Sequence, residues 1–325
     1  MRNLENFLKN LNNSIELKGS FRFDEPMGAH TTFKVGGPAD LWIRPDPAEF
    51  PEFCPLLLKN ASAEGLSVFI LGGGANIVVS DAGIRGIVLD LGAWTGMDRV
   101  GESGLSFRSG TSLDAAANAA ADAGLTGLEF LAGMPGSIGG GVWMNARCYE
   151  TSMSDVLTET EILDETFRRV WVKAKTEDFG YKKSPFQNRR VLILSARFLL
   201  AKDEPARIRH KMEEHRRDRE AKGHYRFPSA GSAFKNNRDF GKPTGKIIDE
   251  LGLRGRSRGG AAIAPWHGNL LINTGGASAE DIRALVEEVT EEVYRRRGII
   301  LEPEILFINS FGKLVCRMSL SNQFV

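Results

Sequence analysis

Short hydrophobic runs and amphipathic stretches alternate along most of the chain, so we expect strands and helices to be interspersed. Runs rich in β-branched and aromatic residues predict strands at residues 30–40, 68–71, 77–79, 86–91, 105–108, 170–173, 191–200, 259–263, 270–273 and 300–308. Helical spacing of apolar positions predicts helices near the N-terminus and at residues 47–64, 112–124, 202–224, 244–251 and 278–298. This mixture predicts an α+β fold.

The clearest predicted helix lies between Ser278 and Gly298. Ser278 can cap its first turn, arginines fill its last turn, and Gly298 can end it. Its apolar residues fall on one face, at Ile282, Leu285, Val286, Val289 and Val293. We therefore expect that face to cover a hydrophobic core.

A second well-marked helix follows Ser112, with Asp114 in its first turn and Gly124 just past its end. It is unusually rich in alanine. Small side chains permit close packing against a sheet or a ligand, but high helix propensity alone would also explain them.

Two glycine-dense loops are the most informative segments of the sequence. The first, Gly72–Asn76, follows the strand at 68–71, and the second lies within Leu131–Asn145, where five glycines accompany Pro135 and Ser137. Glycine costs backbone entropy, so a dense run needs a reason. It forms either a tight turn between packed elements or a nest of backbone N–H groups that binds a phosphate. The presence of two such runs favours the nest.

The first loop differs from a dinucleotide-binding fingerprint. Ile77 stands where the third glycine of that fingerprint would be, and Ile77–Val79 is strand-like rather than the start of a helix. A Rossmann phosphate site needs a helix N-terminus at this point. We therefore predict strand–loop–strand, with loop N–H groups and the Asn76 amide facing a ligand.

The composition changes at residues 202–224, which are densely charged and have Ile208 and Met212 as their few apolar anchors. We predict a solvated connector helix here. It leads from an N-terminal segment and cofactor-binding domain at 1–201, with its core at residues 31–201, into a smaller α+β substrate domain at 202–325 that includes the connector. His210 and His215 on this helix are spaced poorly for two ligands on one face, so we expect surface residues.

Composition and charge exclude several classes of protein. A hydrophobic fraction of 42%, a charged fraction of 26% and a net charge of +1 indicate a globular protein without a general attraction to nucleic acid or anionic membranes. Cys54, Cys148 and Cys316 lack CxxC spacing. This argues against a zinc site and a disulfide framework, and it fits a reducing cytoplasm. No apolar run approaches the roughly 20 residues needed to cross a bilayer, and the N-terminus lacks a signal-peptide core. We expect a cytoplasmic protein without a metal, nucleic-acid or membrane partner.

Five motifs occur in order along the chain, and together they are more specific than any one of them. They are Thr31–Ala39, Leu71–Asn76, Gly133–Gly140, Ser229–Asn236 and Leu301–Ile305. Through these motifs the chain resembles the UDP-N-acetylenolpyruvoylglucosamine reductases, over residues 28–309. Its compact ending resembles the shorter type of this family.

The resemblance implies a flavoenzyme of peptidoglycan precursor synthesis. FAD would be held in a domain of the vanillyl-alcohol oxidase and p-cresol methylhydroxylase type, and NADPH would be the reductant. The reaction would be hydride transfer to the enolpyruvyl double bond of UDP-N-acetylglucosamine enolpyruvate, which gives UDP-N-acetylmuramate. We expect a monomer whose partners are this substrate and NADPH.

Three residues are candidates for catalysis. Hydride addition leaves negative charge that the substrate carboxylate takes up, so the site needs cations or donors near that carboxylate and a proton donor for the adjacent carbon. The resemblance assigns the proton to Ser232, which local sequence alone would make a turn residue. Lys182 lies in Tyr181–Ser184, where the family usually has Tyr-Arg-x-Ser. It keeps the positive charge but loses the two-pronged geometry of arginine.

Glu304 matches the family's catalytic glutamate. A glutamate that is kept protonated can donate to an enolate. Glu302 alternates with Glu304 on the predicted strand, so we expect Glu302 to face the other way, at the surface.

The loop around Tyr181, residues 179–187, is equally well interpreted on local grounds as a plain surface turn.

The resemblance also assigns residues that bind FAD and substrate. For FAD they are Gly72, Gly73, Gly74, Ala75, Asn76, Pro135, Gly136, Ser137, Gly139, Gly140 and Asn145. For the substrate they are Tyr181, Lys235 and Asn236, with the last two near the diphosphate. Arg256 and Arg258 are weaker candidates for positive charge near that diphosphate, and we expect His267 to be structural.

Two other interpretations stay open on sequence. One is a flavin oxidase of the same cofactor fold that acts on another substrate; the loop of Ser232 and the strand of Glu304 argue against it. The other is a nucleotide-sugar-binding relative with impaired catalysis, suggested by Lys182. It would bind its ligand without reduction of a flavin by NADPH.

Overall fold

The computed structural model describes residues 2–15 and 18–315, so the expectation for Cys316 lies outside the described residues. The chain forms two compact units. Unit 1 comprises Met1–Arg22, Leu41–Gly73 and Ile87–Asp218, and unit 2 comprises Phe23–Asp40, Gly74–Gly86 and Arg219–Val325. Each unit thus takes up separate segments of the chain. The contiguous domains expected from the sequence, divided at residue 202, stay a prediction.

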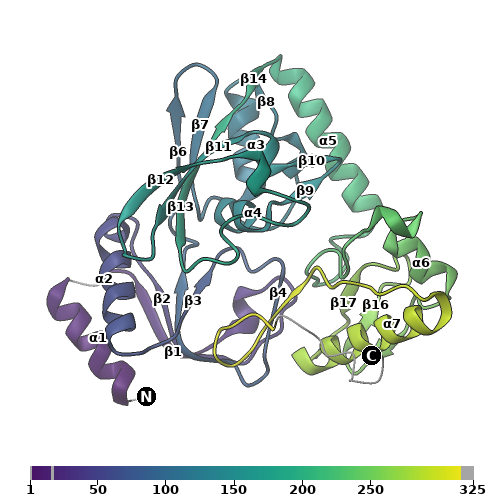
Figure 1. The fold of residues 1–325 in the computed structure, drawn as a ribbon, viewed down its shortest axis with the longest axis horizontal. Coiled ribbons are helices and arrows are strands. Elements are labelled where there is room, and N and C mark those ends of the chain that lie inside the picture. Colours follow the sequence, from purple (N-terminus) through teal and green to yellow (C-terminus); the bar gives the residue numbers. More distant parts are fainter. Residues whose placement is uncertain (1, 16–17, 316–325) are drawn as a thin grey trace. The chain divides into compact units, whose positions relative to one another are not determined.

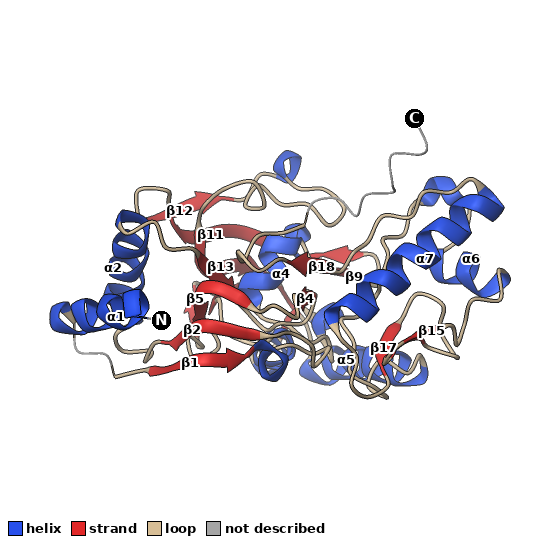
Figure 2. Cartoon of the chain, turned by 90° about the horizontal axis from the view of Figure 1, so that it is seen from below, coloured by secondary structure: helices blue, strands red, loops and turns tan. Residues whose placement is uncertain are grey.

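Three strands contain a boundary between the units, and they belong to a four-stranded sheet of order β1-β2-β5-β3. Their bounds are β1 (Ser20–Pro26), β2 (Pro38–Arg44) and β5 (Ile84–Asp90). Figure 2 draws β1, β2 and β5 as neighbouring strands. Within unit 1, β3 (Val68–Leu71) pairs in parallel with β5, from Val68 opposite Ile87 to Leu71 opposite Asp90.

Unit 1 is built around a five-stranded antiparallel sheet of order β12-β11-β13-β7-β6 (Figure 1). These strands are β6 (Met97–Val100), β7 (Gly104–Arg108), β11 (Leu157–Leu163), β12 (Arg169–Lys173) and β13 (Leu192–Leu199). The helices are α1 (Arg2–Ser14), α2 (Phe50–Ala63), α3 (Leu113–Asp122), α4 (Ile138–Met144) and α5 (Pro205–Ala221), the last of which enters unit 2 after Asp218. Short strand pairs join β8 (Leu125–Thr126) to β14 (Ala201–Lys202) and β9 (Arg147–Cys148) to β10 (Thr151–Ser152).

Helix α4 packs against β13 and β7 of this sheet, and α3 packs against α4 and β8. Ala116, Ala117, Ala120 and Ala121 of α3 are all buried in the core that contains Phe107 and Phe198. Burial of these alanines favours close packing over helix propensity as their role. The predicted cap also holds, because Ser112 Oγ accepts from the Ala115 N–H. Ile208 and Met212 of α5 are buried in the same core, so their prediction as anchors is confirmed.

Unit 2 packs α7 (Ala279–Arg297) and α6 (Thr244–Glu250) with a small sheet of order β15-β16-β17 (Figure 2). The strands are β15 (Ser257–Arg258), β16 (Ala261–Ile263), β17 (Leu271–Asn273), and the parallel pair β4 (Ile77–Val79) and β18 (Leu306–Ile308). The five predicted apolar residues of α7 are fully buried, and Ser278 and Asp281 form a capping box, so this helix is confirmed from start to end.

Several elements differ from the sequence prediction. The strand expected at 30–40 is wrong, because residues 31–37 form a loop closed by a hydrogen bond from Thr31 Oγ1 to the Val35 carbonyl, and β2 begins only at Pro38. The strand expected at 300–308 is reduced to β18, because Pro303 cannot donate to a ladder. The helix expected at 47–64 begins at Phe50 and runs through Pro55 without a break.

The strands β1, β6 and β11 and the helix α4 were not predicted from the sequence. No helix among the described residues combines the length and the hydrophobicity that a bilayer crossing requires.

Candidate active site

The two glycine loops meet within unit 1. The Gly73 N–H donates to Ser137 Oγ over 3.3 Å. A Cβ atom on Gly73 would lie 2.7 Å from the Gly136 Cα atom. Only glycine permits two backbones to approach this closely, so Gly73 is required by contact between the loops. Gly136 has a φ of 124°, a conformation that favours glycine in its own right.

Ser137 organises the surface where the loops meet. It is buried, caps α4 and accepts from the Gly140 N–H, while Gly73 and Gly140 on either side of it are exposed. The exposed surface is therefore backbone at this point, with the N-terminus of α4 beside it. Backbone N–H groups at a helix start are suited to bind phosphate oxygens.

The end of the first glycine loop belongs to unit 2, where it holds the segment that carries Glu304. Asn76 Nδ2 donates to the Glu304 carbonyl over 3.1 Å, and the Asn76 carbonyl accepts from the Leu306 N–H over 2.9 Å. The strand–loop–strand prediction is confirmed by β3 and β4. The side chain of Asn76 positions Glu304, whereas its contact with a cofactor stays a prediction.

Unit 2 places Ser232 and Glu304 on adjacent segments. The Glu304 N–H donates to the carbonyl of Ala233, the residue after Ser232, over 2.8 Å. Phe234 and Pro303 form an antiparallel bridge in the same pair of segments, and Ser232 itself is bridged to Leu270. Both candidate residues are half-buried. A hydroxyl and a carboxyl group on adjacent segments can serve one substrate carbon and its carboxylate.

Asn269 fixes the segment that follows Ser232, although the sequence analysis did not single it out. Its side chain accepts from the Phe234 N–H over 2.9 Å and donates to the Phe234 carbonyl over 2.8 Å. Its carbonyl accepts from the Ala233 N–H. His267 Nδ1 accepts in turn from the Asn269 N–H over 3.2 Å, which supports the expected structural role of His267.

Lys235 and Asn236 lie at the end of the same loop. Lys235 Nζ forms an ion pair with Glu302, whose exposed position is the expected one. Asn236 Oδ1 accepts from the Thr244 N–H at the start of α6. The side chain of Lys235 is only 17% exposed and is paired with Glu302, so its role near a diphosphate stays a prediction.

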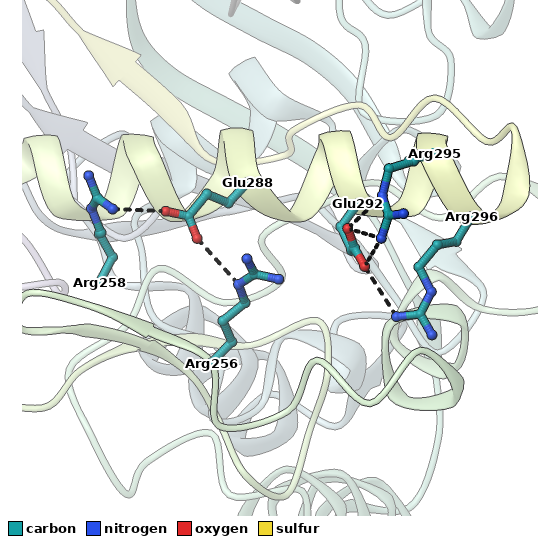
Figure 3. A network of polar contacts seen from close by, with 6 residues as sticks. All are labelled: Arg256, Arg258, Glu288, Glu292, Arg295 and Arg296. Atoms are coloured by element: carbon teal, nitrogen blue, oxygen red, sulfur yellow. Dashed lines mark hydrogen bonds and ion pairs between the residues drawn. The ribbon is translucent and has the colours of Figure 1, made fainter.

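Arg256 and Arg258 pair with Glu288 of α7 (Figure 3). Both guanidinium groups lie 3.3 Å from a carboxylate oxygen of this single residue. The positive charges of both arginines are therefore already paired with a carboxylate of α7, which argues against their binding the diphosphate.

The loop that contains Lys182 forms a tight turn in unit 1. Gly180 and Lys183 exchange two backbone hydrogen bonds, and Lys182 has a left-handed backbone with a φ of 58°. Ser184 Oγ donates to the Trp143 carbonyl of α4 over 2.6 Å. The loop is therefore anchored to the helix that begins in the second glycine loop, while Tyr181 is exposed at its tip.

Two family profiles match parts of this chain. The family profile "UDP-N-acetylenolpyruvoylglucosamine reductase, C-terminal domain" matches residues 223–308, and the profile "FAD binding domain" matches residues 55–172. The UDP-N-acetylenolpyruvoylglucosamine reductase of Borreliella burgdorferi is 38% identical, with 94% of this chain and 98% of the relative covered. That of Treponema denticola is 40% identical, with 96% and 100% covered. The chain belongs to the UDP-N-acetylenolpyruvoylglucosamine reductase family.

A solved structure of a family member shares the fold. The crystal structure of UDP-N-acetylenolpyruvylglucosamine reductase (MurB) from Thermus caldophilus matches with a TM-score of 0.74 at 32% identity. The match covers 90% of this chain and 99% of the other. The resemblance stated from the sequence motifs is thus confirmed.

In this reductase-family chain, Asn145 supports the loop of Lys182. It ends α4 in a left-handed conformation with a φ of 45°. Its Nδ2 donates to the Gly180 carbonyl over 2.9 Å, and its Oδ1 accepts from the Ser154 N–H over 3.0 Å. Both polar ends of the buried amide are used within the protein, which favours a positioning role; contact with FAD stays a prediction.

His215 is a correction to the sequence analysis, which expected a surface residue. Its ring stacks on Tyr149 with 3.9 Å between centroids, and its Nδ1 lies 3.0 Å from the Glu129 carbonyl. His210 is exposed, as expected, and pairs with Glu214. A charged helix pattern did not reveal that one histidine faces the protein.

Proposed function

We propose that this chain reduces the enolpyruvyl double bond of UDP-N-acetylglucosamine enolpyruvate with electrons from NADPH, giving UDP-N-acetylmuramate for peptidoglycan synthesis. One observation carries the proposal: Ser232 and Glu304 lie on adjacent segments joined by the hydrogen bond from the Glu304 N–H to the Ala233 carbonyl. An oxidase would not need a proton donor for carbon at that position. The names of the close relatives support the same substrate.

The glycine loops fit FAD as the cofactor. A side chain on Gly73 would collide with Gly136, so this surface consists of backbone that a diphosphate can approach. Gly72, Gly73, Gly136, Ser137 and Gly140 would hold the cofactor through such contacts. When bound, FAD supplies a carrier that takes a hydride from NADPH and releases it to the substrate.

The residues of the chain supply the acid and the charge for the reaction. As hydride reaches the terminal carbon of the enolpyruvyl group, negative charge develops on the adjacent carbon and on the carboxylate. Ser232 donates its hydroxyl proton to that adjacent carbon. Glu304 donates to the carboxylate and so stabilises the enolate-like state.

Lys182 and Tyr181 bind the substrate in this proposal. Lys182 supplies a positive charge to the substrate carboxylate as a single point, without the paired donors of an arginine. Lys235 and Asn236 contact the diphosphate, and the ion pair of Lys235 with Glu302 would then be exchanged for phosphate oxygens. We also propose that the enzyme works as a monomer in the cytoplasm, where its nucleotide substrate and NADPH are found.

An anaerobic spectrum of the purified protein tests this function. NADPH should bleach the oxidised flavin bands, and added UDP-N-acetylglucosamine enolpyruvate should restore them. Flavin that is reduced but not reoxidised by this compound would contradict the proposed substrate.

The same experiment on variants tests Lys182. Lys182→Ala should be reduced by NADPH at the wild-type rate but reoxidised at least roughly tenfold more slowly, because one charge-assisted contact is lost. Lys182→Arg should match or exceed the wild type. Equal reoxidation rates in Lys182→Ala and the wild type would exclude Lys182 from the reaction.

A further inference from the structure

A short segment of unit 1, residues 109–114, runs alongside the second glycine loop. The Gly139 N–H donates to the Ser109 carbonyl, the Ile138 N–H donates to the Thr111 carbonyl, and the Leu113 N–H donates to the Gly136 carbonyl. These three contacts join backbone to backbone. They therefore hold residues 136–139 of the loop independently of the side chains.

The beginning of the loop is held differently, by a side chain. The Gly133 N–H donates to Asp114 Oδ1 over 2.7 Å. Gly133 has a φ of 70°, a left-handed conformation that glycine adopts at little cost and that starts the loop. At the beginning of the loop, the Asp114 carboxylate therefore takes the place that backbone carbonyls have at residues 136–139.

Arg216 of α5 completes this arrangement. Its NH2 group donates to the same Asp114 oxygen over 2.8 Å and to Asn118 Oδ1 over 3.2 Å. Asn118 in turn donates to the other Asp114 oxygen. Burial alone would raise the pKa of Asp114, but the hydrogen bonds from the Gly133 amide and Arg216 outweigh it and hold the pKa below its ordinary value of 3.8. The carboxylate is thus charged and fixed in orientation by three partners.

The same half of α5 contacts the segments on both sides of the glycine loop. His215 Nδ1 lies 3.0 Å from the Glu129 carbonyl, before the loop. Tyr149, which follows α4, donates from its hydroxyl to Asp218 over 2.9 Å. The charged helix that the sequence indicated as a solvated connector is therefore attached around the loop at three points.

We propose that Asp114, held by Arg216, is a positioning residue for the cofactor: it fixes the Gly133 amide and thereby sets the shape of the loop that binds the FAD diphosphate. The inference rests on the proposed use of FAD and extends it to two residues that are not expected to touch the cofactor. A loop that is already in its binding shape loses less entropy when the ligand binds. Removal of either residue should therefore weaken FAD binding before it affects the fold.

A matched pair of residues provides the control. Asp122 and Arg209 form an ion pair between the same two helices, α3 and α5, but both side chains are exposed and Asp122 lies eight residues beyond Asp114, at the end of α3. Asp122→Ala and Arg209→Ala thus remove a bridge of the same chemistry between the same helices.

The test measures the dissociation constant of FAD by flavin fluorescence on protein freed of flavin. Asp114→Ala should bind FAD roughly tenfold more weakly, because the loop loses one hydrogen bond to a charged group. Arg216→Ala should weaken binding less, because Asp114 keeps its bond to the Gly133 N–H and loses only the arginine that orients it. Arg216→Lys should recover part of the affinity, and both control variants should stay within about twofold of the wild type. Asp114→Ala that binds FAD as the wild type does would overturn the proposal.

A second readout does not depend on flavin. Amide hydrogen exchange of the segment 131–137 in the flavin-free protein should be faster in Asp114→Ala and in Asp114→Asn than in Asp122→Ala. Unchanged exchange in this segment would also overturn the proposal. FAD binding by the wild type and by Asp122→Ala tests the proposed function separately, since both retain the Asp114 contact.

Discussion

Asparagine side chains carry much of the local order around the candidate catalytic residues. Asn76 binds the Glu304 carbonyl, Asn145 binds the Gly180 carbonyl beside Tyr181, and Asn269 binds both polar groups of Phe234. Each amide replaces a backbone partner that an irregular segment lacks. Loops without regular hydrogen bonding can therefore hold Ser232, Glu304 and Lys182 in defined conformations.

A sequence motif does not reveal which backbone group each asparagine side chain binds. The family resemblance assigned Asn76 and Asn145 to FAD, and in the segment 265–269 His267 was singled out rather than Asn269. Whether an amide faces a ligand or a carbonyl depends on segments such as 180 or 304 that are distant in sequence. The residue types at the site were therefore predictable, whereas the partners of each side chain were not.

We expect His267 to make the loop of Ser232 sensitive to acid. Burial lowers the pKa of His267 below its ordinary value of 6.5, and the nearby Asp249 only partly opposes this effect. The folded protein then binds fewer protons than the unfolded chain as the pH falls through 6.5, so the free energy of unfolding should decrease over that range. Protonation would also remove the acceptor for the Asn269 N–H.

Urea unfolding of the wild type and His267→Asn between about pH 5 and pH 8 checks this expectation. His267→Asn should lose part of the decrease below pH 6.5, because asparagine does not titrate. His210→Asn is the matched control, since His210 is exposed on α5. An identical pH dependence in the wild type and His267→Asn would contradict the assignment.

At the scale of elements, prediction succeeded where the sequence of one element contains its own signals. Helices α3 and α7 each have a serine cap, an apolar face and a glycine at or beyond the end. Both helices are present in the structure. Strands β6 and β11 have no such local signature, because β6 is exposed throughout and β11 depends on its neighbours β12 and β13. Helix α4 was missed because its glycines disfavour a helix, and packing against β13 overrides that propensity.

The start of α7 depends on a residue from a distant segment. Asp81 accepts from the N–H groups of Ala279 and Glu280, next to the capping box of Ser278 and Asp281. Loss of the Asp81 carboxylate leaves two N–H groups at the helix start without this acceptor, so Asp81→Ala should lower the free energy of unfolding by about 1 kcal/mol.

Glu288 on the exposed side of α7 gives the comparison (Figure 3). It holds Arg256 and Arg258, but these pairs lie at the surface, where each is expected to contribute about 0.5 kcal/mol or less. Glu288→Ala should therefore destabilise less than Asp81→Ala, and its effect should shrink in roughly 1 M salt. Chemical denaturation in low and high salt measures both, and the reverse order would contradict this account of the helix.

At the scale of the molecule, each hydrophobic core combines segments that are far apart in the sequence. The core of unit 2 contains Phe33, Val35 and Val78 together with α7 and the loop of Ser232. Thr32 Oγ1 also donates to the Ser229 carbonyl over 2.7 Å. A composition break at residue 202 indicates where the charged helix begins, but it cannot indicate that earlier segments return to the later core.

Phe33 tests this organisation most directly, because it is 1% exposed in the core of unit 2 although it lies nearly 190 residues before most of that unit. Phe33→Ala should lower the free energy of unfolding by about 3–5 kcal/mol, since it leaves a cavity among α7 and its neighbours. Phe21, 45% exposed, is the control, and Phe21→Ala should change stability by about 0.5 kcal/mol or less. Hydrogen exchange of the α7 amides should quicken in Phe33→Ala and not in Phe21→Ala. If α7 kept wild-type protection in Phe33→Ala, the later core would be independent of the N-terminal segment, and the contiguous domain expected at 202–325 would be the better description.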